Sequence, residues 1–176
     1  MSELRVTYYV AASLDGFIAG PEGEIDWLDM VSDPGEDYGY HAFIESVDGL
    51  VLGRSTWNFL EGVGGWPYGD LPGWVFSHRP VEPGDAPVTR VEGEPAAVLD
   101  ALERDGHRHV WLVGGGGLAS SLAESGHLTD LILTVVPMRL GAGLSLFAPG
   151  GPRVPWAHVG TRSYPSGLVQ SRYRRI

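Results

Sequence analysis

The 176-residue chain contains neither cysteine nor lysine, so all 12 of its basic residues are arginines. The lack of cysteine excludes a disulfide framework, a cysteine-ligated zinc site, an iron–sulfur cluster and a thiol nucleophile. The lack of lysine excludes a Walker A loop, a Schiff-base enzyme and a lysine general base.

Long apolar runs are also missing. No stretch approaches the roughly 20 apolar residues of a membrane-spanning helix. The first five residues lack the charged and apolar regions of a signal peptide. We therefore expect a cytoplasmic protein without a membrane partner.

Positive charge is scarce in the first part of the chain. Residues 1–105 carry 20 acidic residues and 5 arginines, a balance of −15, whereas residues 106–176 carry 2 acidic residues and 7 arginines, a balance of +5. The net charge of −10 argues against nucleic acid as a partner. An anionic ligand is therefore expected to be held by a few specifically positioned groups instead of a generally basic surface. The arginine-rich end has no predicted role.

The length fits one domain over residues 1–176, and 43% hydrophobic residues supply an ordinary core. Helical spacing or start signals predict helices over 38–47, from Ser55 or Thr56 to Leu60, over 95–105 and over 118–124. Apolar runs predict strands over 6–12, 50–52, 74–76, near Val88, over 110–113 and over 131–136. Residues 156–174 resemble an antiparallel hairpin. This alternation predicts an α/β fold with a mainly parallel sheet and an antiparallel C-terminal edge.

Four consecutive glycines, Gly114 to Gly117, separate a predicted buried strand from a predicted helix. Glycines allow close approach to the backbone, and the start of a helix offers free N–H groups that suit a phosphate. A tight turn without any ligand is the alternative. The Rossmann reading of Gly114-x-Gly116-x-x-Ala119 is unfavourable, because no acidic ribose ligand ends the following strand.

A second junction of the same kind has Gly53, Arg54, Ser55 and Thr56 after the strand over 50–52. Arg54 could pair with a phosphate, although an ordinary helix start with a surface arginine fits equally. Because parallel strands share one carboxyl edge, two such junctions suit a dinucleotide, and Arg54 suggests NADPH. Ser77, after a third strand, could contact the adenosine portion.

The motifs Ala11–Ala19, Gly53–Trp57, Val113–Gly116, Leu131–Pro137 and Leu140–Phe147 occur in this order along the whole chain. Together they closely resemble the dihydrofolate reductase-like superfamily. The resemblance is greatest to the branch that contains the C-terminal reductase domain of the bifunctional riboflavin-biosynthesis deaminase–reductase RibD.

The resemblance implies a three-layer α/β fold, bound NADPH and a homodimer formed through the later strands. It places Ala12, Ile18 and Gly20 beside the nicotinamide, next to a mobile loop containing Trp27. The remaining residues implied for cofactor binding are Gly53, Arg54, Ser55, Thr56, Ser77, Gly115, Gly116, Gly117 and Leu118.

Two features depart from the riboflavin-pathway reductases. Phe17 stands where they have a basic residue, and the segment Gly53–Trp57 follows the dihydrofolate reductase pattern instead of theirs. Both departures count against a phosphoribosyl substrate.

Reduction by NADPH also requires a proton, which a buried carboxyl group or a histidine could supply. Spacing from dihydrofolate reductases selects Asp37 as the catalytic candidate, with a solvated helix-start carboxylate as the alternative. Asp15 and His41 are candidate substrate residues, although Asp15 also fits a turn and His41 a structural role. His107 and His109 lack neighbouring ligands in the sequence, so we predict no metal.

Three hypotheses remain open. The first is an NADPH-dependent reductase of a pterin-like or related heteroaromatic substrate. The second is the riboflavin-pathway reductase of a ribosylamino-pyrimidine, and the third is a non-catalytic nucleotide-binding protein.

Overall fold

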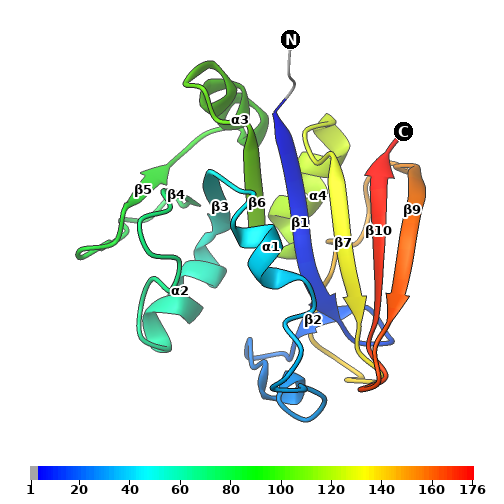
Figure 1. Cartoon of the computed structure of the whole chain (residues 1–176). Coiled ribbons are helices and arrows are strands. Elements are labelled where there is room, and N and C mark those ends of the chain that lie inside the picture. Colours follow the sequence, from blue (N-terminus) through cyan, green and yellow to red (C-terminus); the bar gives the residue numbers. More distant parts are fainter. Residues whose placement is uncertain (1–3) are drawn as a thin grey trace.

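The computed structural model describes residues 4–176 (Figure 1). Its strands are β1 (Arg5–Ala12), β2 (Phe17–Ala19), β3 (Gly49–Gly53), β4 (Gly73–Phe76), β5 (Val88–Val91), β6 (His109–Gly114), β7 (Asp130–Val135), β8 (Leu144–Ser145), β9 (Trp156–Ser163) and β10 (Val169–Arg175). Its helices are α1 (Tyr40–Ile44), α2 (Arg54–Gly62), α3 (Pro95–Arg104) and α4 (Gly116–Ser125), with a 3-10 turn at Asp26–Leu28.

Eight strands form one sheet in the order β5-β4-β3-β6-β1-β7-β10-β9. Neighbouring strands from β5 to β7 are parallel, whereas β10 runs antiparallel to both β7 and β9. The short strands β2 and β8 form a separate antiparallel pair. The predicted mixed sheet with a C-terminal hairpin is therefore confirmed.

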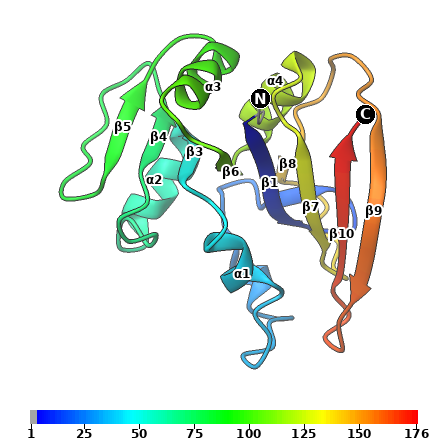
Figure 2. The same cartoon turned by 45° about the horizontal axis from the view of Figure 1, so that its top comes forward.

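The sheet lies between two helical layers (Figure 2). On one face, α3 and α4 bury Leu99, Leu102 and Leu122 against residues of β1 and β6 such as Val6 and Leu112. On the other face, α1 packs through Phe43 on Trp111, and α2 through Trp57 and Leu60 on Leu52 and Val75. Fully burying an aliphatic side chain contributes about 1.5–3 kcal/mol to the free energy of folding. Both helical layers therefore stabilise the sheet. No helix in residues 4–176 is long and apolar enough to cross a membrane.

Several predicted helix boundaries are wrong. The helix expected over 38–47 extends only from Tyr40 to Ile44, because Tyr38 and Gly39 both have positive φ angles, 55° and 82°. Neither Ser55 nor Thr56 caps α2, which begins at Arg54 after an extended Gly53 with no side-chain cap.

The four-glycine turn is also shorter than predicted. Gly114 ends β6, and Gly116 and Gly117 belong to the first turn of α4, so only Gly115 lies between the strand and the helix. The stretch after β1, predicted as loop, contains β2, which pairs with the unpredicted β8. Such pairing between distant segments leaves no local signal in the sequence.

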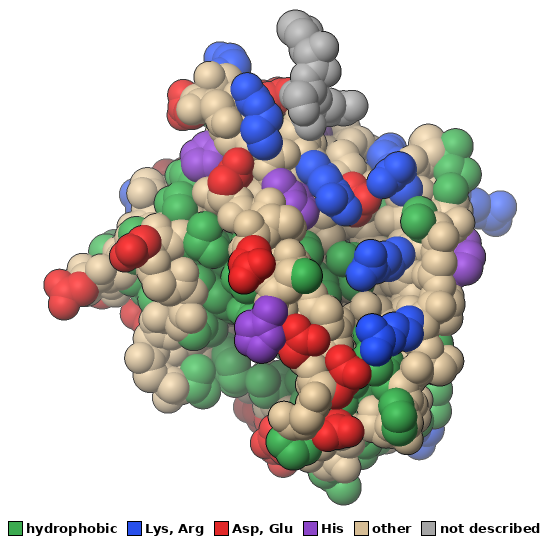
Figure 3. Space-filling view, viewed as in Figure 1, with side chains coloured by type: hydrophobic (Ala, Val, Ile, Leu, Met, Phe, Trp, Pro, Cys, Tyr) green, Lys and Arg blue, Asp and Glu red, His purple; other side chains and the backbone are tan. Residues whose placement is uncertain are grey.

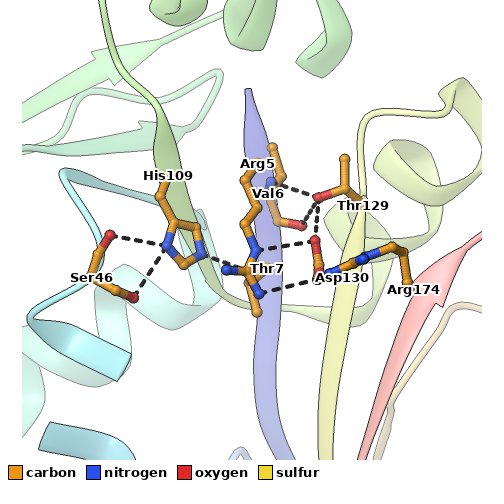
Figure 4. Close-up of polar contacts among 8 residues, drawn as sticks. All are labelled: Arg5, Val6, Thr7, Ser46, His109, Thr129, Asp130 and Arg174. Carbon is orange, nitrogen blue, oxygen red and sulfur yellow. Dashed lines mark hydrogen bonds and ion pairs between the residues drawn. The ribbon is translucent and has the colours of Figure 1, made fainter. Parts of the chain in front are cut away.

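A buried polar chain crosses the amino ends of the strands (Figure 4). His109 Nδ1 lies 3.0 Å from the Ser46 carbonyl oxygen, and His109 Nε2 lies 2.8 Å from Thr7 Oγ1. A carbonyl oxygen can only accept, so Nδ1 carries the proton and Nε2 accepts from Thr7. Burial, followed by the charge of Arg5, lowers the pKa of His109. The fold therefore favours the neutral imidazole.

Beside this chain, Asp130 is a buried carboxylate whose partners satisfy it. Arg5 Nε lies 3.2 Å and Arg174 Nε 3.6 Å from its oxygens. Thr129 Oγ1 donates to it at 2.8 Å and also binds the backbone of Val6. A buried charge needs such partners, and here they tie β1, β7 and β10 together.

We predict that His109 makes the fold sensitive to acid. Because its pKa is lower in the folded than in the unfolded chain, its contribution is present above the ordinary value of 6.5 and is lost as pH falls through the folded value. His109→Gln should lower the free energy of unfolding near neutral pH by about 1–3 kcal/mol. It should also flatten the decline below neutrality in urea titrations. The exposed His158, changed to Gln, is the matched control, and an equal flattening there would contradict the assignment.

Candidate functional site

Three glycine- or serine-bearing strand ends meet at the carboxyl edge of the sheet. In the parallel registers, Gly53 of β3 pairs with Phe76, which precedes Ser77, and Leu52 pairs with Gly114. A Cβ atom placed on Gly53 would lie 3.8 Å from both the Gly114 carbonyl oxygen and the Gly115 nitrogen. The two predicted junctions are therefore direct neighbours.

The start of α4 is closed on one side and open on the other. A Cβ atom on Gly116 would lie only 2.2 Å from the Ser145 carbonyl oxygen, whereas Cβ atoms on Gly115 and Gly117 would meet nothing within 4 Å. No side chain caps this helix start. The structure thus leaves free backbone N–H groups beside an open surface, the arrangement that accepts a phosphate. Leu118 follows in the same turn and packs partly against the core.

The start of α2 contributes a second uncapped set of N–H groups. Thr56 faces the end of β6, because a Cβ atom on Gly114 would come 3.1 Å from Thr56 Oγ1. Ser55 is exposed in the first turn. Two helix starts with partial positive charge therefore lie side by side.

Arg54 bridges α2 and the loop after β4. Its Nε donates to Asn58 Oδ1 at 2.7 Å, and its Nη1 donates to the Pro80 carbonyl oxygen. The same Nη1 lies 3.4 Å from Ser77 Oγ and from the Arg79 carbonyl oxygen. Its Nη2 makes no hydrogen bond with residues 4–176. Arg54 thus holds the loop in place while keeping donor groups for a ligand.

Ser77 has a structural role in this loop. It is buried, and its hydroxyl group donates to the Arg79 carbonyl oxygen at 2.8 Å and accepts from the Arg79 N–H at 3.1 Å. This arrangement orients the loop next to Arg54 and leaves the Arg79 side chain exposed. Arg79 is a basic group of the site that sequence reasoning did not single out.

Asp15 holds two loops together. Its carboxylate accepts from Ser13 Oγ at 2.7 Å, from the Leu140 N–H at 3.1 Å and from the Gly141 N–H at 2.7 Å. These bonds, led by the one from Ser13, lower the pKa of Asp15 to about 2. Its acceptors are largely used, which favours a loop-anchoring role over the predicted substrate contact.

The residues predicted beside the nicotinamide lie at and after the carboxyl end of β1. Ala12 is buried, Ile18 is half-buried in β2, and Gly20 donates its N–H to the Glu24 carbonyl oxygen in a tight turn. Trp27 is only 4% exposed and packs with Val136. It is therefore anchored in a core cluster, although its indole N–H has no partner among the described residues.

Asp37 and His41 meet on an open hollow of about 640 Å³, which Glu36 and Tyr40 also line. Asp37 Oδ2 lies 2.8 Å from His41 Nδ1, and the carboxylate also accepts the N–H groups of Gly39 and His41. These bonds, led by the one from Gly39, lower the pKa of Asp37. A proton donor near neutrality needs a raised pKa, so the lowered pKa does not favour Asp37 as the proton donor. Asp37 is an exposed carboxylate that accepts N–H groups at the start of α1.

A buried polar cluster under the start of α1 was not predicted. Gln170 Nε2 lies 3.0 Å from the Tyr38 carbonyl oxygen and 3.1 Å from Thr134 Oγ1, and Tyr9 donates its hydroxyl to the same Tyr38 oxygen. Burial raises the pKa of Tyr9 to about 12, so its hydroxyl stays protonated. Nothing in the sequence around Gln170 signals a buried polar group. For Thr134 the one signal is that it is the polar residue within the apolar run 131–136.

Comparison with known proteins places this chain in a family. The model of the RibD C-terminal domain matches residues 5–170. The "Uncharacterized protein YwjB" of Bacillus subtilis is 35% identical over 146 residues, which cover 82% of this chain and 83% of that protein. The riboflavin biosynthesis protein RibD of Corynebacterium ammoniagenes is 30% identical over 160 residues, covering 82% of this chain but 46% of that protein.

Solved structures agree. The "Putative riboflavin biosynthesis protein" of Shewanella sp. superposes with a TM-score of 0.90 at 28% identity, covering 98% of this chain and 99% of that one. A deaminase/reductase of Thermotoga maritima has a TM-score of 0.75 at 17% identity, with 99% of this chain and 57% of that chain covered. The protein therefore belongs to the RibD C-terminal domain family, a reductase-like branch of the dihydrofolate reductase-like superfamily, and has its three-layer α/β fold.

Proposed function

We propose that this protein is an NADPH-dependent reductase of a small pterin- or pyrimidine-like substrate. The observation that carries the proposal is the pair of uncapped helix starts, α2 and α4, side by side at the carboxyl edge of the sheet. Membership of a reductase-like family supports it. When bound, the cofactor would supply the hydride.

The residues at this edge fit such a cofactor. The open surface at Gly115 and Gly117 suits a pyrophosphate, because a side chain there would occupy the space that the phosphates need. Arg54 and Arg79 provide positive charge near the adenosine side, where a 2′-phosphate distinguishes NADPH from NADH. Ala12 and Ile18 would border the nicotinamide, and the exposed rim beyond them would face the substrate.

The substrate site would lie between β1 and the start of α1. The buried cluster of Tyr9, Thr134 and Gln170 would form the floor beneath this site and hold the start of α1 in place through the Tyr38 carbonyl oxygen. Asp37 and His41, with Oδ2 and Nδ1 2.8 Å apart, line the hollow at the edge of this site.

A second candidate is the 5-amino-6-(5-phosphoribosylamino)uracil reductase activity named for the Thermotoga maritima protein. The 30% identity to RibD of Corynebacterium ammoniagenes favours it. The acidic hollow around Glu36 and Asp37, and Phe17 in place of a basic residue, favour a substrate without a phosphoribosyl group. Loss of NADPH absorbance with a panel of dihydropterins and ribosylaminopyrimidines would decide between the two. NADPH binding without turnover of any member would instead indicate a non-catalytic nucleotide-binding protein.

We predict that Arg54 discriminates between the two nicotinamide cofactors. In thermal-shift assays the wild type should be stabilised more by NADPH than by NADH, and Arg54→Ala should remove this difference. Loss of a charge-assisted pair corresponds to roughly 10- to 100-fold weaker NADPH binding. Arg104→Ala, on the opposite layer, is the control. Equal stabilisation of the wild type by both cofactors would refute the 2′-phosphate contact.

The two neighbouring glycines of α4 should respond differently to added side chains. Gly117→Val projects into open space, so it should leave the melting temperature nearly unchanged while weakening NADPH binding at least about tenfold. Gly116→Ala collides with the Ser145 carbonyl oxygen and should lower the melting temperature itself. Calorimetric titration together with thermal melting separates the two effects. Unchanged NADPH affinity in Gly117→Val would place the pyrophosphate elsewhere.

Asp37→Asn should leave the pH profile of hydride transfer unchanged in shape, because the pKa of Asp37 is already lowered and its carboxylate donates no proton near neutrality. The asparagine retains an oxygen that can accept the Gly39 N–H. Stopped-flow measurement of NADPH oxidation across pH tests this. A selective slowing of the variant at high pH would restore Asp37 as the proton source.

A further inference from the structure

Residues 138–148 form an irregular segment that joins two parts of the candidate site, the loop after β1 and the start of α4. Of these residues only Leu144 and Ser145 belong to a strand, the short β8. Leu146 and Phe147 pack into the core cluster of α3 and α4, on the side of the sheet opposite to α1, whose charged surroundings Figure 3 shows. We call residues 138–148 the connecting segment. Because it has so little regular structure, its position depends on contacts with other segments.

At its first end the connecting segment is held by the loop after β1. The Asp15 carboxylate accepts the N–H groups of Leu140 and Gly141 at 3.1 and 2.7 Å. Next to Asp15, Leu14 donates its N–H to the Met138 carbonyl oxygen at 2.8 Å. The two N–H groups bound by Asp15 reach different oxygens of its carboxylate, so both oxygens are needed to hold this end.

The middle of the connecting segment packs against the backbone of β2. Phe17 pairs with Ser145, and Ala19 pairs with Leu144. A Cβ atom placed on Gly143 would lie only 2.1 Å from the Ala19 carbonyl oxygen. The two backbones are therefore in close contact, and a displacement of the loop after β1 displaces the connecting segment as well.

At its other end the connecting segment touches α4. The Ser145 carbonyl oxygen would lie 2.2 Å from a Cβ atom on Gly116, so the backbones meet closely there too. Ala148 donates its N–H to Ser120 Oγ at 2.8 Å, and the same N–H lies 3.3 Å from the Gly116 carbonyl oxygen. Ser120 follows Gly116 by about one helical turn. These contacts fix the side of the helix start that faces away from the open surface.

We propose that the connecting segment couples the two ends of the cofactor site, with Asp15 and Ser120 as the positioning residues that anchor it. The loop after β1 would border the nicotinamide and the start of α4 would bind the pyrophosphate, so this role rests on the proposed function. The coupling itself rests only on the contacts within the chain. A segment fixed at two points loses its position when either point is released, so each anchor should affect the other end. Asp15 thereby acts on the pyrophosphate end without touching a phosphate.

Amide hydrogen exchange without cofactor tests the coupling. Ser120→Ala keeps a good helix former in α4. It should speed exchange of the Leu140 and Gly141 N–H groups at least about fivefold, although Ser120 lies at the other end of the connecting segment. Asp15→Ala should speed exchange of the Ala148 N–H by a similar factor. Asp15→Asn retains one acceptor oxygen and should have an intermediate effect.

Cofactor binding gives a second measurement. Asp15→Ala and Ser120→Ala should each weaken binding about tenfold, by the same factor for NADPH and NADH, because the pyrophosphate is common to both. The double variant should also lose only about tenfold, whereas independent sites would lose about 100-fold. Calorimetric titration of the three variants measures this difference.

Ser125→Ala, at the far end of α4, is the matched control. Ser125 Oγ donates to the Leu122 carbonyl oxygen of the same helix, so its loss should change neither the exchange rates nor the affinity. Exchange that changes only beside the substituted residue would overturn the proposal, and so would losses of affinity that multiply in the double variant. Faster exchange throughout β1 and β6 would overturn it too, because it would indicate a general loss of stability. A wild type that binds neither cofactor would refute the proposed function, and the exchange rates alone would then decide on the coupling.

Discussion

The parallel pairing of β3 with β6, and of β3 with β4, is the constraint on which the candidate site depends. It brings Gly53 next to Gly114 and Gly115, and it sets Ser77 beside Arg54. No single segment has a complete site: α2 and α4 each present uncapped N–H groups, and only the sheet order makes them neighbours. A change that shifted this register would remove the site without altering any of its residues.

The two ends of the sheet differ in how their polar groups are satisfied. At the amino end, Thr7, His109 and Asp130 are buried and each has hydrogen-bond partners within the chain (Figure 4). At the carboxyl end, two helix starts have no side-chain caps, and the glycines leave open space in front of them. Because unpaired polar groups cost stability when buried, a fold keeps them where a ligand or solvent can reach them. The contrast indicates which end is structural and which is available for binding.

The sequence predicted what local patterns encode. Apolar runs located the main strands, and the order of glycine junctions pointed to the shared edge before any contact was known. The predictions that failed depend on contacts between distant segments or on backbone geometry. Gly116 and Gly117 were expected in a turn, but they form the first turn of α4, and the Ser145 carbonyl oxygen lies against Gly116.

Contacts between distant segments also explain why the roles of several side chains were not predicted. Asp15 is joined to Leu140 and Gly141, more than 120 positions away, and no pattern within its own loop signals this. Asp37 has the spacing of a catalytic carboxylate, but the positive φ angles of Tyr38 and Gly39 turn the chain so that its oxygens cap α1. Gln170 belongs to a strand whose sequence is mostly polar. It is buried because Thr134 of β7 and Tyr38, in the loop before α1, contact its amide group.

The fold also determines how the unevenly distributed charges of the sequence lie relative to one another. The balances of −15 and +5 belong to the first and last parts of the chain, and the antiparallel return of β10 and β9 sets the second beside the first on one face. Opposite charges within one chain usually pair internally, and Arg162 with Glu36 does so. Arg172 and Glu45 instead are exposed and have no ion-pair partner within residues 4–176. The order of the strands in the sheet, and not their order in the sequence, therefore decides which of these charges become neighbours.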